Sequence, residues 1–176
     1  TNDAPLSFPV GVTTVTWTAT DAAGNNVSCT QMVTVVDVQA PTLICPPQVI
    51  VNTDAASCFA TGVVLGSPIT SDNCGVTSIT NDAPASYALG NSIVTWTVID
   101  AAGNSTTCEQ DVLVIDNELP TIVCAGPLTV NTDPASCEAT GVILGTPTTG
   151  DNCSVANTFN NAPLAYMLGV NTVTWT

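Results

Sequence analysis

The clearest alternation of apolar and polar positions lies in residues 92–99, where every second residue from Val94 to Val98 is large and apolar. A period of two over this length is typical of a β-strand that buries one face. Residues 100–104 follow as a turn that contains a glycine, and residues 108–115 then return as a second, partly apolar run. The pattern predicts a β-hairpin with one buried face.

Shorter apolar runs precede this hairpin, and each is bounded by Pro, Gly, Asn or Asp. Runs rich in Val, Ile and Thr between such turn formers are typical of strands. No stretch repeats its apolar residues with the 3.6-residue period of a helix. About seven short strands are therefore predicted, which favours an all-β, immunoglobulin-like sandwich. The other predicted strands cover residues 43–45, 49–52, 59–65 and 76–80.

The chain also repeats itself without gaps, as a 79-residue unit. Trp17, Trp96 and Trp175 each lie one such unit apart, and we expect these tryptophans to fill the core of each sandwich. A single exact period indicates tandem domains of one kind. The same spacing separates Cys29 from Cys108, Cys45 from Cys124, Cys58 from Cys137 and Cys74 from Cys153.

The boundaries of the repeat follow from two places where a strand, a linker and a new strand succeed one another. Residues 41–119 are predicted to form one complete repeat, residues 1–40 the C-terminal half of a preceding one, and residues 120–176 a repeat without its last strands. Because residues 19–40 contain what the last segment lacks, two interpretations stay open: one longer chain, or copies that donate strands to each other end to end. The linkers are Asp37–Pro41 and Asp116–Pro120.

The charge balance excludes several classes of function. The chain has 14 acidic residues and no Lys, Arg or His. Nucleic acid is excluded as a partner because no cation can replace the counterions on phosphate. The usual general bases and cationic groups of active sites are also missing, so no enzyme is predicted. No apolar run reaches the roughly 18 residues of a membrane span.

The eight cysteines include no CxxC pair, which favours disulfides over a zinc site. Disulfides imply an oxidising compartment, so we expect an extracellular or cell-surface protein. All eight are predicted disulfide residues, Cys137 and Cys153 among them. Within the complete repeat we favour Cys45–Cys108 with Cys58–Cys74, and the alternative is Cys45–Cys58 with Cys74–Cys108. The favoured pairing leaves Cys29 and Cys124 without partners in this chain.

The acidic residues gather in the turns and linkers that flank each predicted junction between repeats. Without internal cations, these carboxylates must be solvated, accept backbone N–H bonds as turn caps, or bind a metal ion. Calcium is the candidate metal because it takes six to eight oxygen ligands. Turn capping alone is the competing interpretation. The candidate calcium ligands are Asp21, Asn25, Asp37, Asp72, Asp100, Asn104, Asp116, Glu118 and Asp151.

Covalent sugar is a further expectation. Three N-glycosylation sequons begin at Asn26, Asn104 and Asn152. Thr is even more abundant, so outward strand positions and linkers could carry O-linked glycan.

Five segments are distinctive: Asp37–Pro46, Asp72–Gly75, Gly90–Thr97, Asp100–Asn104 and Cys108. Together they resemble a known family, the hyalin repeat or HYR domain. The resemblance spans the whole 79-residue unit, and one departure is Cys124-Ala-Gly-Pro127 in place of Cys45-Pro-Pro47. It implies immunoglobulin-like modules of adhesive extracellular proteins, which in bacteria occur in very long secreted surface proteins.

The repeats and this resemblance predict a structural protein that forms a stalk, fibre or filament of a cell surface, a bacterial one by the resemblance. Its partners would be copies of itself arranged end to end. The alternative is an adhesive binding module that recognises glycan or a partner protein through loops such as Asp72–Gly75.

Overall fold

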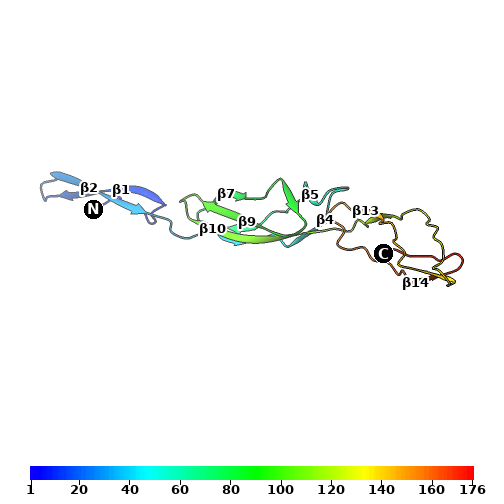
Figure 1. Cartoon of the computed structure of the whole chain (residues 1–176). Helices are drawn as coiled ribbons and strands as arrows, with labels where there is room; N and C mark the ends of the chain where they lie inside the picture. Colours follow the sequence, from blue (N-terminus) through cyan, green and yellow to red (C-terminus); the bar gives the residue numbers. More distant parts are fainter. The chain divides into compact units, whose positions relative to one another are not determined.

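The computed structural model describes all 176 residues and contains β-strands and no helix (Figure 1). It therefore has no helix with the length and apolarity needed to cross a membrane. Contacts within the chain define two compact units. One contains residues 1–48, 65–83 and 93–111, and the other contains residues 49–64, 84–92 and 112–176.

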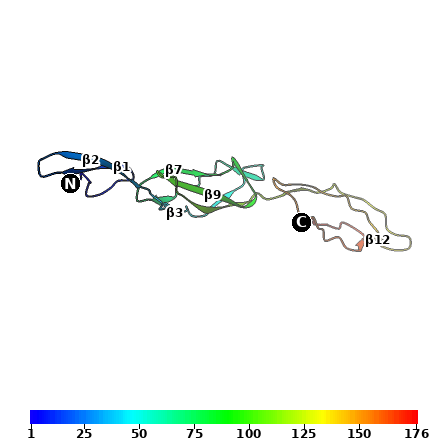
Figure 2. The same cartoon turned by 90° about the vertical axis from the view of Figure 1, so that its left-hand side faces the viewer.

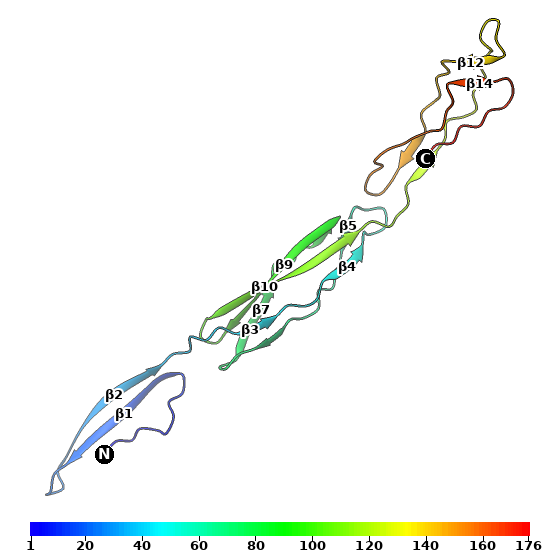
Figure 3. The same ribbon diagram turned by 90° about the horizontal axis from the view of Figure 1, so that it is seen from below.

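A four-stranded sheet with the order β4-β10-β9-β7 is the largest element (Figure 3). The long hairpin predicted from the alternation forms its centre as β9 and β10. β7 pairs antiparallel with β9, whereas β4 pairs parallel with β10. The strands are β4 (Val49–Asn52), β7 (Val76–Asn81), β9 (Gly90–Asp100) and β10 (Ser105–Ile115).

Two small antiparallel pairs complete the repeat that contains this sheet. β3 pairs with β6, and β5 pairs with β8. The sequence prediction missed β6 and β8 and extended β5 too far, to residue 65. The strands are β3 (Thr42–Ile44), β5 (Phe59–Thr61), β6 (Ile69–Ser71) and β8 (Ser86–Ala88).

The core lies on the inner face of the β9–β10 hairpin. Val94, Val98, Val112 and Val114 are at most 1% exposed, and Trp96 is 6% exposed. The predicted alternation is thus present, with Val94, Trp96 and Val98 buried and the residues between them, such as Ile93, more exposed. Each valine is worth about 1.5–3 kcal/mol when fully removed from water, so this face is a main source of stability.

The flanking segments reproduce parts of the same repeat (Figure 2). The hairpin of β1 and β2 is equivalent to β9–β10, and its Trp17 is 44% exposed. Toward the C-terminus, the pairs β11–β13 and β12–β14 are equivalent to β3–β6 and β5–β8. These strands are β1 (Gly11–Thr20), β2 (Asn26–Val35), β11 (Thr121–Val123), β12 (Glu138–Thr140), β13 (Thr148–Gly150) and β14 (Ala165–Met167).

Candidate functional site at the repeat junctions

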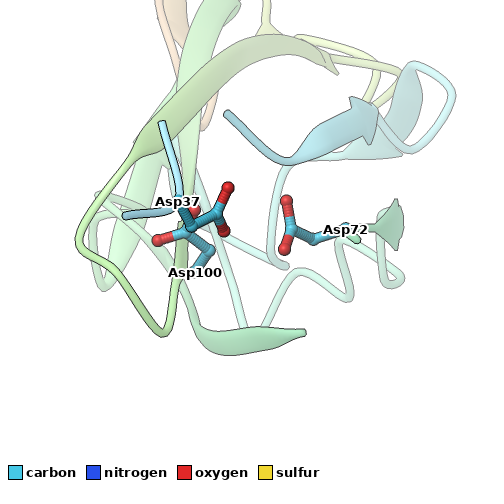
Figure 4. Close-up of side chains that lie close together, drawn as sticks. All are labelled: Asp37, Asp72 and Asp100. Atoms are coloured by element: carbon cyan, nitrogen blue, oxygen red, sulfur yellow. The ribbon is translucent and has the colours of Figure 1, made fainter. Parts of the chain in front are cut away.

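Three carboxylates meet where the first linker approaches the complete repeat (Figure 4). Asp37 comes from the linker before β3, Asp72 from the turn between β6 and β7, and Asp100 from the end of β9. One ligand oxygen of each lies within 4.8 Å of the others. No Lys, Arg or His exists in the chain to neutralise them. The structure thus brings three of the nine candidate calcium ligands into one cluster.

Asp100 organises the β9–β10 turn. Its Oδ1 accepts hydrogen bonds from the backbone N–H groups of Ala102 (2.9 Å) and Asn104 (2.8 Å), and its Oδ2 accepts one from Asn104 Nδ2 (2.7 Å). Burial by itself raises the pKa of Asp100. Hydrogen bonds from the side chain and backbone of Asn104, and from the two N–H groups before it, outweigh this effect, so the pKa lies below its ordinary value.

Asn104 fastens the linker to this turn. Its Nδ2 also donates to the carbonyl oxygens of Asp37 (3.3 Å) and Gln39 (3.2 Å). Thr106 Oγ1 donates to the carbonyl oxygen of Pro41 at 2.6 Å. The turn therefore fixes the path by which the chain enters the repeat. Asp21 and Asn25 make the corresponding turn in the β1–β2 hairpin, where their side chains bond only within the turn.

Asp37 and Asp72 each use one oxygen as a cap and leave the other without a partner. Asp72 Oδ2 accepts from the N–H groups of Cys74 (2.7 Å) and Gly75 (2.9 Å). Asp37 Oδ1 accepts from Gln39 N–H (3.1 Å) and Asn73 Nδ2 (3.4 Å). Asp37 Oδ2 and Asp72 Oδ1 are buried and make no hydrogen bond. Turn capping therefore occurs, but it leaves two buried oxygens for a hard cation, and calcium fits that donor chemistry.

The second junction contains the equivalent loops in contact with the preceding repeat. Asn152 Nδ2 donates to Thr53 Oγ1 (3.2 Å), the Ser57 carbonyl oxygen (2.9 Å) and Asp116 Oδ1 (3.3 Å). Asp151 caps its own turn as Asp72 does. A second contact lies nearby, where Glu118 Oε2 accepts from the N–H of Ala56 at 3.3 Å, and Ala56 has a φ of 57°.

The disulfides differ from the favoured pairing in one of the two bonds. The structure joins Cys45 to Cys108 with a Cα–Cα distance of 5.8 Å, as we favoured. It joins Cys58 to Cys153, at 4.7 Å, in place of the predicted Cys58–Cys74. The alternative pairing of Cys45 with Cys58 is therefore also wrong. We call Cys58–Cys153 the junction bond, because it links the predicted repeat 41–119 to residues 120–176.

The reason for this correction lies along β10. The turn that holds Cys58 bonds to the end of β10, because Thr53 N–H donates to the Ile115 carbonyl at 2.9 Å. The loop that holds Cys74 bonds beside the start of β10, through Ala101 N–H and the Gly75 carbonyl at 3.2 Å. Ten residue steps of about 3.3 Å separate the two ends of the strand. A disulfide needs Cα atoms within about 7 Å. Cys29, Cys74, Cys124 and Cys137 are unbonded and exposed.

Two of the three sequons use their attachment nitrogen in the junctions. Asn104 and Asn152 donate from Nδ2 to linker or neighbouring groups, as described above. Asn26 is exposed at the start of β2. N-glycosylation stays a prediction, and Asn26 is the sequon whose nitrogen is not engaged in these contacts.

Comparison with known proteins places these features in a family. The family model of the HYR domain matches residues 1–35 and 36–114, which is more than half of the chain. The chain belongs to the HYR domain family. Curated relatives agree with this assignment, and the chain spans less than a third of their length. Together with the disulfides, they identify an extracellular, adhesion-type repeat module.

These relatives include two hyalins and a multidomain protein. Hyalin of Strongylocentrotus purpuratus is 31% identical over 169 residues, which cover 89% of this chain and 14% of hyalin. Hyalin of Lytechinus variegatus is 29% identical over 158 residues, which cover 86% of this chain and 30% of hyalin. Sushi, von Willebrand factor type A, EGF and pentraxin domain-containing protein 1 of Rattus norvegicus is 31% identical over 117 residues, which cover 62% of this chain and 3% of that protein.

One solved structure is similar at a greater distance. The protocadherin gamma B7 extracellular cadherin domains 1-4 match with a TM-score of 0.44 and 11% identity, over 93% of this chain and 50% of that chain.

Proposed function

We propose that this chain is a load-bearing segment of an extracellular stalk, fibre or filament at a cell surface, built from HYR repeats that follow one another end to end. The observation that carries the proposal is the junction bond, Cys58–Cys153. Neither a binding loop nor an active site needs a covalent link between successive repeats. It does prevent the junction from being pulled open.

The two disulfides also form overlapping loops, which suits a chain under tension. Cys45–Cys108 closes a loop with a sequence separation of 63 residues, and the junction bond closes one of 95 residues. Cys58 lies inside the first loop and Cys108 inside the second. A force applied at the ends therefore runs from Cys45 to Cys58 and across the junction bond, and the residues between Cys58 and Cys153 bear none of it.

The alternative of a binding module gains less support. Its candidate loop, Asp72–Gly75, has an equivalent in residues 151–154, and there the loop is occupied by the preceding repeat through Asn152 and Cys153. A loop used for contact between repeats is not free to bind glycan. The lack of His, Lys and Arg likewise favours a non-enzymatic protein.

Single-molecule force spectroscopy tests the load path. When the oxidised chain is stretched between its ends, it should release about 34 nm less contour length than the reduced chain, because 95 residues at about 3.6 Å each stay hidden. The Cys58→Ser variant should hide only the 63 residues of the other loop, about 23 nm. Equal contour lengths for oxidised and reduced chains would contradict the proposal.

We further propose that calcium binds the cluster of Asp37, Asp72 and Asp100 and stiffens the junction. The two buried oxygens without hydrogen bonds support this, since an anion left unpaired away from water is costly. Backbone carbonyl groups and water would complete the six to eight ligands that calcium takes. The chain's own part is to hold the three carboxylates together through the Asp100 turn and the Asn104 bonds to the linker.

Calcium should raise the melting temperature of the chain. At about 100 times its dissociation constant, a ligand specific for the folded state adds about 2.7 kcal/mol to the free energy of unfolding. The double variant Asp37→Asn/Asp72→Asn should lose this response in calorimetric melts with calcium and with EDTA. Glu109→Gln removes an exposed charge outside the cluster and should keep the response. Identical melts of the unmodified chain in calcium and EDTA would refute calcium binding.

A further inference from the structure

Two of the unbonded cysteines occupy the positions that the junction bond uses one repeat away. A shift by one 79-residue unit turns Cys74 into Cys153 and Cys58 into Cys137. We propose that Cys74 and Cys137 are half-cystines of further junction bonds, so that a ladder of cystines joins each HYR repeat to the next. Cys74 bonds to the equivalent of Cys58 in the preceding HYR repeat, and Cys137 bonds to the equivalent of Cys153 in the following one. This inference rests on the proposed structural role and extends it to every junction.

The loop that presents Cys74 has the same sequence and bonding as the one that presents Cys153. Both read Asp-Asn-Cys. In each, the Asp Oδ2 accepts from the N–H groups of the cysteine and of the residue after it, at 2.7 and 2.9 Å for Asp72 and at 3.0 and 2.9 Å for Asp151. The cap fixes the backbone on both sides of the cysteine. Cys74 therefore projects from its repeat in the conformation that bonds at the second junction.

The turn that presents Cys137 likewise matches the turn that presents Cys58. Asp54 N–H donates to the Phe59 carbonyl at 2.8 Å, and Asp133 N–H donates to the Glu138 carbonyl at 2.8 Å. Ala56 and Ala135 share the positive φ angles of 57° and 61°, which alanine rarely adopts. Because both turns keep this unusual backbone, each holds its cysteine in the same orientation.

Exposure distinguishes the bonded positions from the unbonded ones. Cys58 and Cys153 are half-buried, whereas Cys137 and Cys74 are exposed. The polar neighbours follow the same rule, since Asn152 is half-buried and its equivalent Asn73 is exposed. The surface around Cys74 and Cys137 is thus the surface that the second junction covers. Cys74 and Cys137 are thus each exposed where a further HYR repeat of the same sequence pattern would bind.

Formation of each bond is an oxidation of two thiols to one cystine. The oxidant is a disulfide, either a small molecule such as oxidised glutathione or a protein of the secretory compartment. One protein thiolate attacks it to give a mixed disulfide and releases one thiol. The second protein thiolate then displaces the other thiol. One cystine forms, the oxidant is reduced to two thiols, and the two protons leave the protein with them.

Cystine mapping of a lengthened chain tests the ladder. One further copy of residues 41–119, marked by Thr77→Ser, is inserted after residue 119, and the protein is secreted with glutathione redox buffer present. Trypsin cannot cut a chain without Lys or Arg, so pepsin at low pH is used, which also prevents exchange. We expect a peptide that joins Cys58 of one copy to Cys74 of the next. A bond between Cys58 and Cys74 of the same copy, or a free thiol at the inner Cys74, would overturn the proposal.

Variants make the assignment specific. Cys58→Ser in the first copy should leave Cys74 of the second copy as a thiol that alkylates fully. Cys29→Ser, which removes an exposed cysteine outside the junction positions, should leave the new bond unchanged. Because the load path through Cys58–Cys153 is measured separately on the original chain, loss of the ladder would be distinguishable from failure of the proposed function.

The original chain identifies the source of the neighbouring repeat. Oxidation of concentrated protein followed by the same mapping should give Cys74–Cys137 bonds between chains if separate copies assemble. Monomers with both thiols intact, alongside a bonded lengthened chain, would assign the ladder to repeats of one polypeptide. Equal amounts of Cys74–Cys74 and Cys137–Cys137 bonds would indicate random oxidation and contradict the ladder.

Discussion

Gln110→Met is expected to lower the free energy of unfolding of the complete repeat by about 2–4 kcal/mol. Gln110 is only 1% exposed and joins three parts of the fold. Its Oε1 accepts from Trp96 Nε1 at 2.9 Å, and its Nε2 donates to the carbonyl oxygens of Pro47 and Leu65, each at 2.8 Å. Methionine has a similar volume but leaves all three partners without a hydrogen bond. Urea denaturation of the oxidised chain measures the change.

The first hairpin provides a matched control for this substitution. Trp17 Nε1 donates to Gln31 Oε1 at 3.0 Å, which is the same pair one repeat earlier, but both residues are exposed. Water can replace the amide there, so Gln31→Met should cost less than about 0.5 kcal/mol. Gln110→Glu should cost about 3–5 kcal/mol, because it buries a charge that faces two carbonyl oxygens. Similar decreases in the free energy of unfolding for Gln110→Met and Gln31→Met would show that burial does not increase what this hydrogen-bond network contributes to stability.

The alternation that predicted the hairpin could also have revealed Gln110. Cys108, Gln110, Val112 and Val114 fall on one face of the returning strand, so a polar residue interrupts an otherwise apolar row. Such an interruption opposite a buried tryptophan indicates a buried hydrogen bond. The sequence thus indicates a buried, hydrogen-bonded glutamine, but it does not identify the carbonyl groups to which Gln110 donates. Pro47 and Leu65 offer backbone carbonyl groups, and nothing in their side chains marks those atoms as acceptors.

Shorter strands gave no comparable signal. β6 and β8 have three residues each, which is too few to establish a period of two. Their pairing with β3 and β5 joins segments far apart in the chain, with Thr42 opposite Ser71 and Phe59 opposite Ala88. β5 ends at Thr61 because Gly62 follows with a positive φ of 62°, although the apolar run continues beyond it. Tertiary pairing and backbone conformation, more than composition, determined these short elements.

The three residues of the acidic cluster are among the nine candidate calcium ligands, but the sequence did not indicate which of the nine meet, and it did not predict the junction bond. Asp37, Asp72 and Asp100 are all turn or linker residues, and their types alone indicated oxygen ligands or caps. Pairing cysteines requires distances between Cα atoms, and those depend on which end of β10 each loop occupies. The favoured pairing and its alternative both lie within one repeat. The repeat itself permits pairing across a junction, since equivalent cysteines recur in every 79-residue unit.

Removal of the Cys45–Cys108 bond should destabilise the complete repeat by about 3–4 kcal/mol. The bond joins the end of β3 to β10 and closes a loop with a sequence separation of 63 residues. Without it the unfolded chain gains conformational entropy, and the loop-closure relation gives about 4 kcal/mol for this length. The junction bond remains and already restricts part of the same segment, so the loss falls somewhat below that figure.

The double variant Cys45→Ala/Cys108→Ala tests this expectation in urea without reductant, so that the junction bond stays intact. Cys29→Ala is the matched control, because Cys29 is the equivalent of Cys108 and is unbonded and exposed. It should change the free energy of unfolding by less than about 0.5 kcal/mol. If the double variant were as stable as the control, the hydrophobic face of β9 and β10 would hold the β3–β6 pair against the four-stranded sheet without the disulfide.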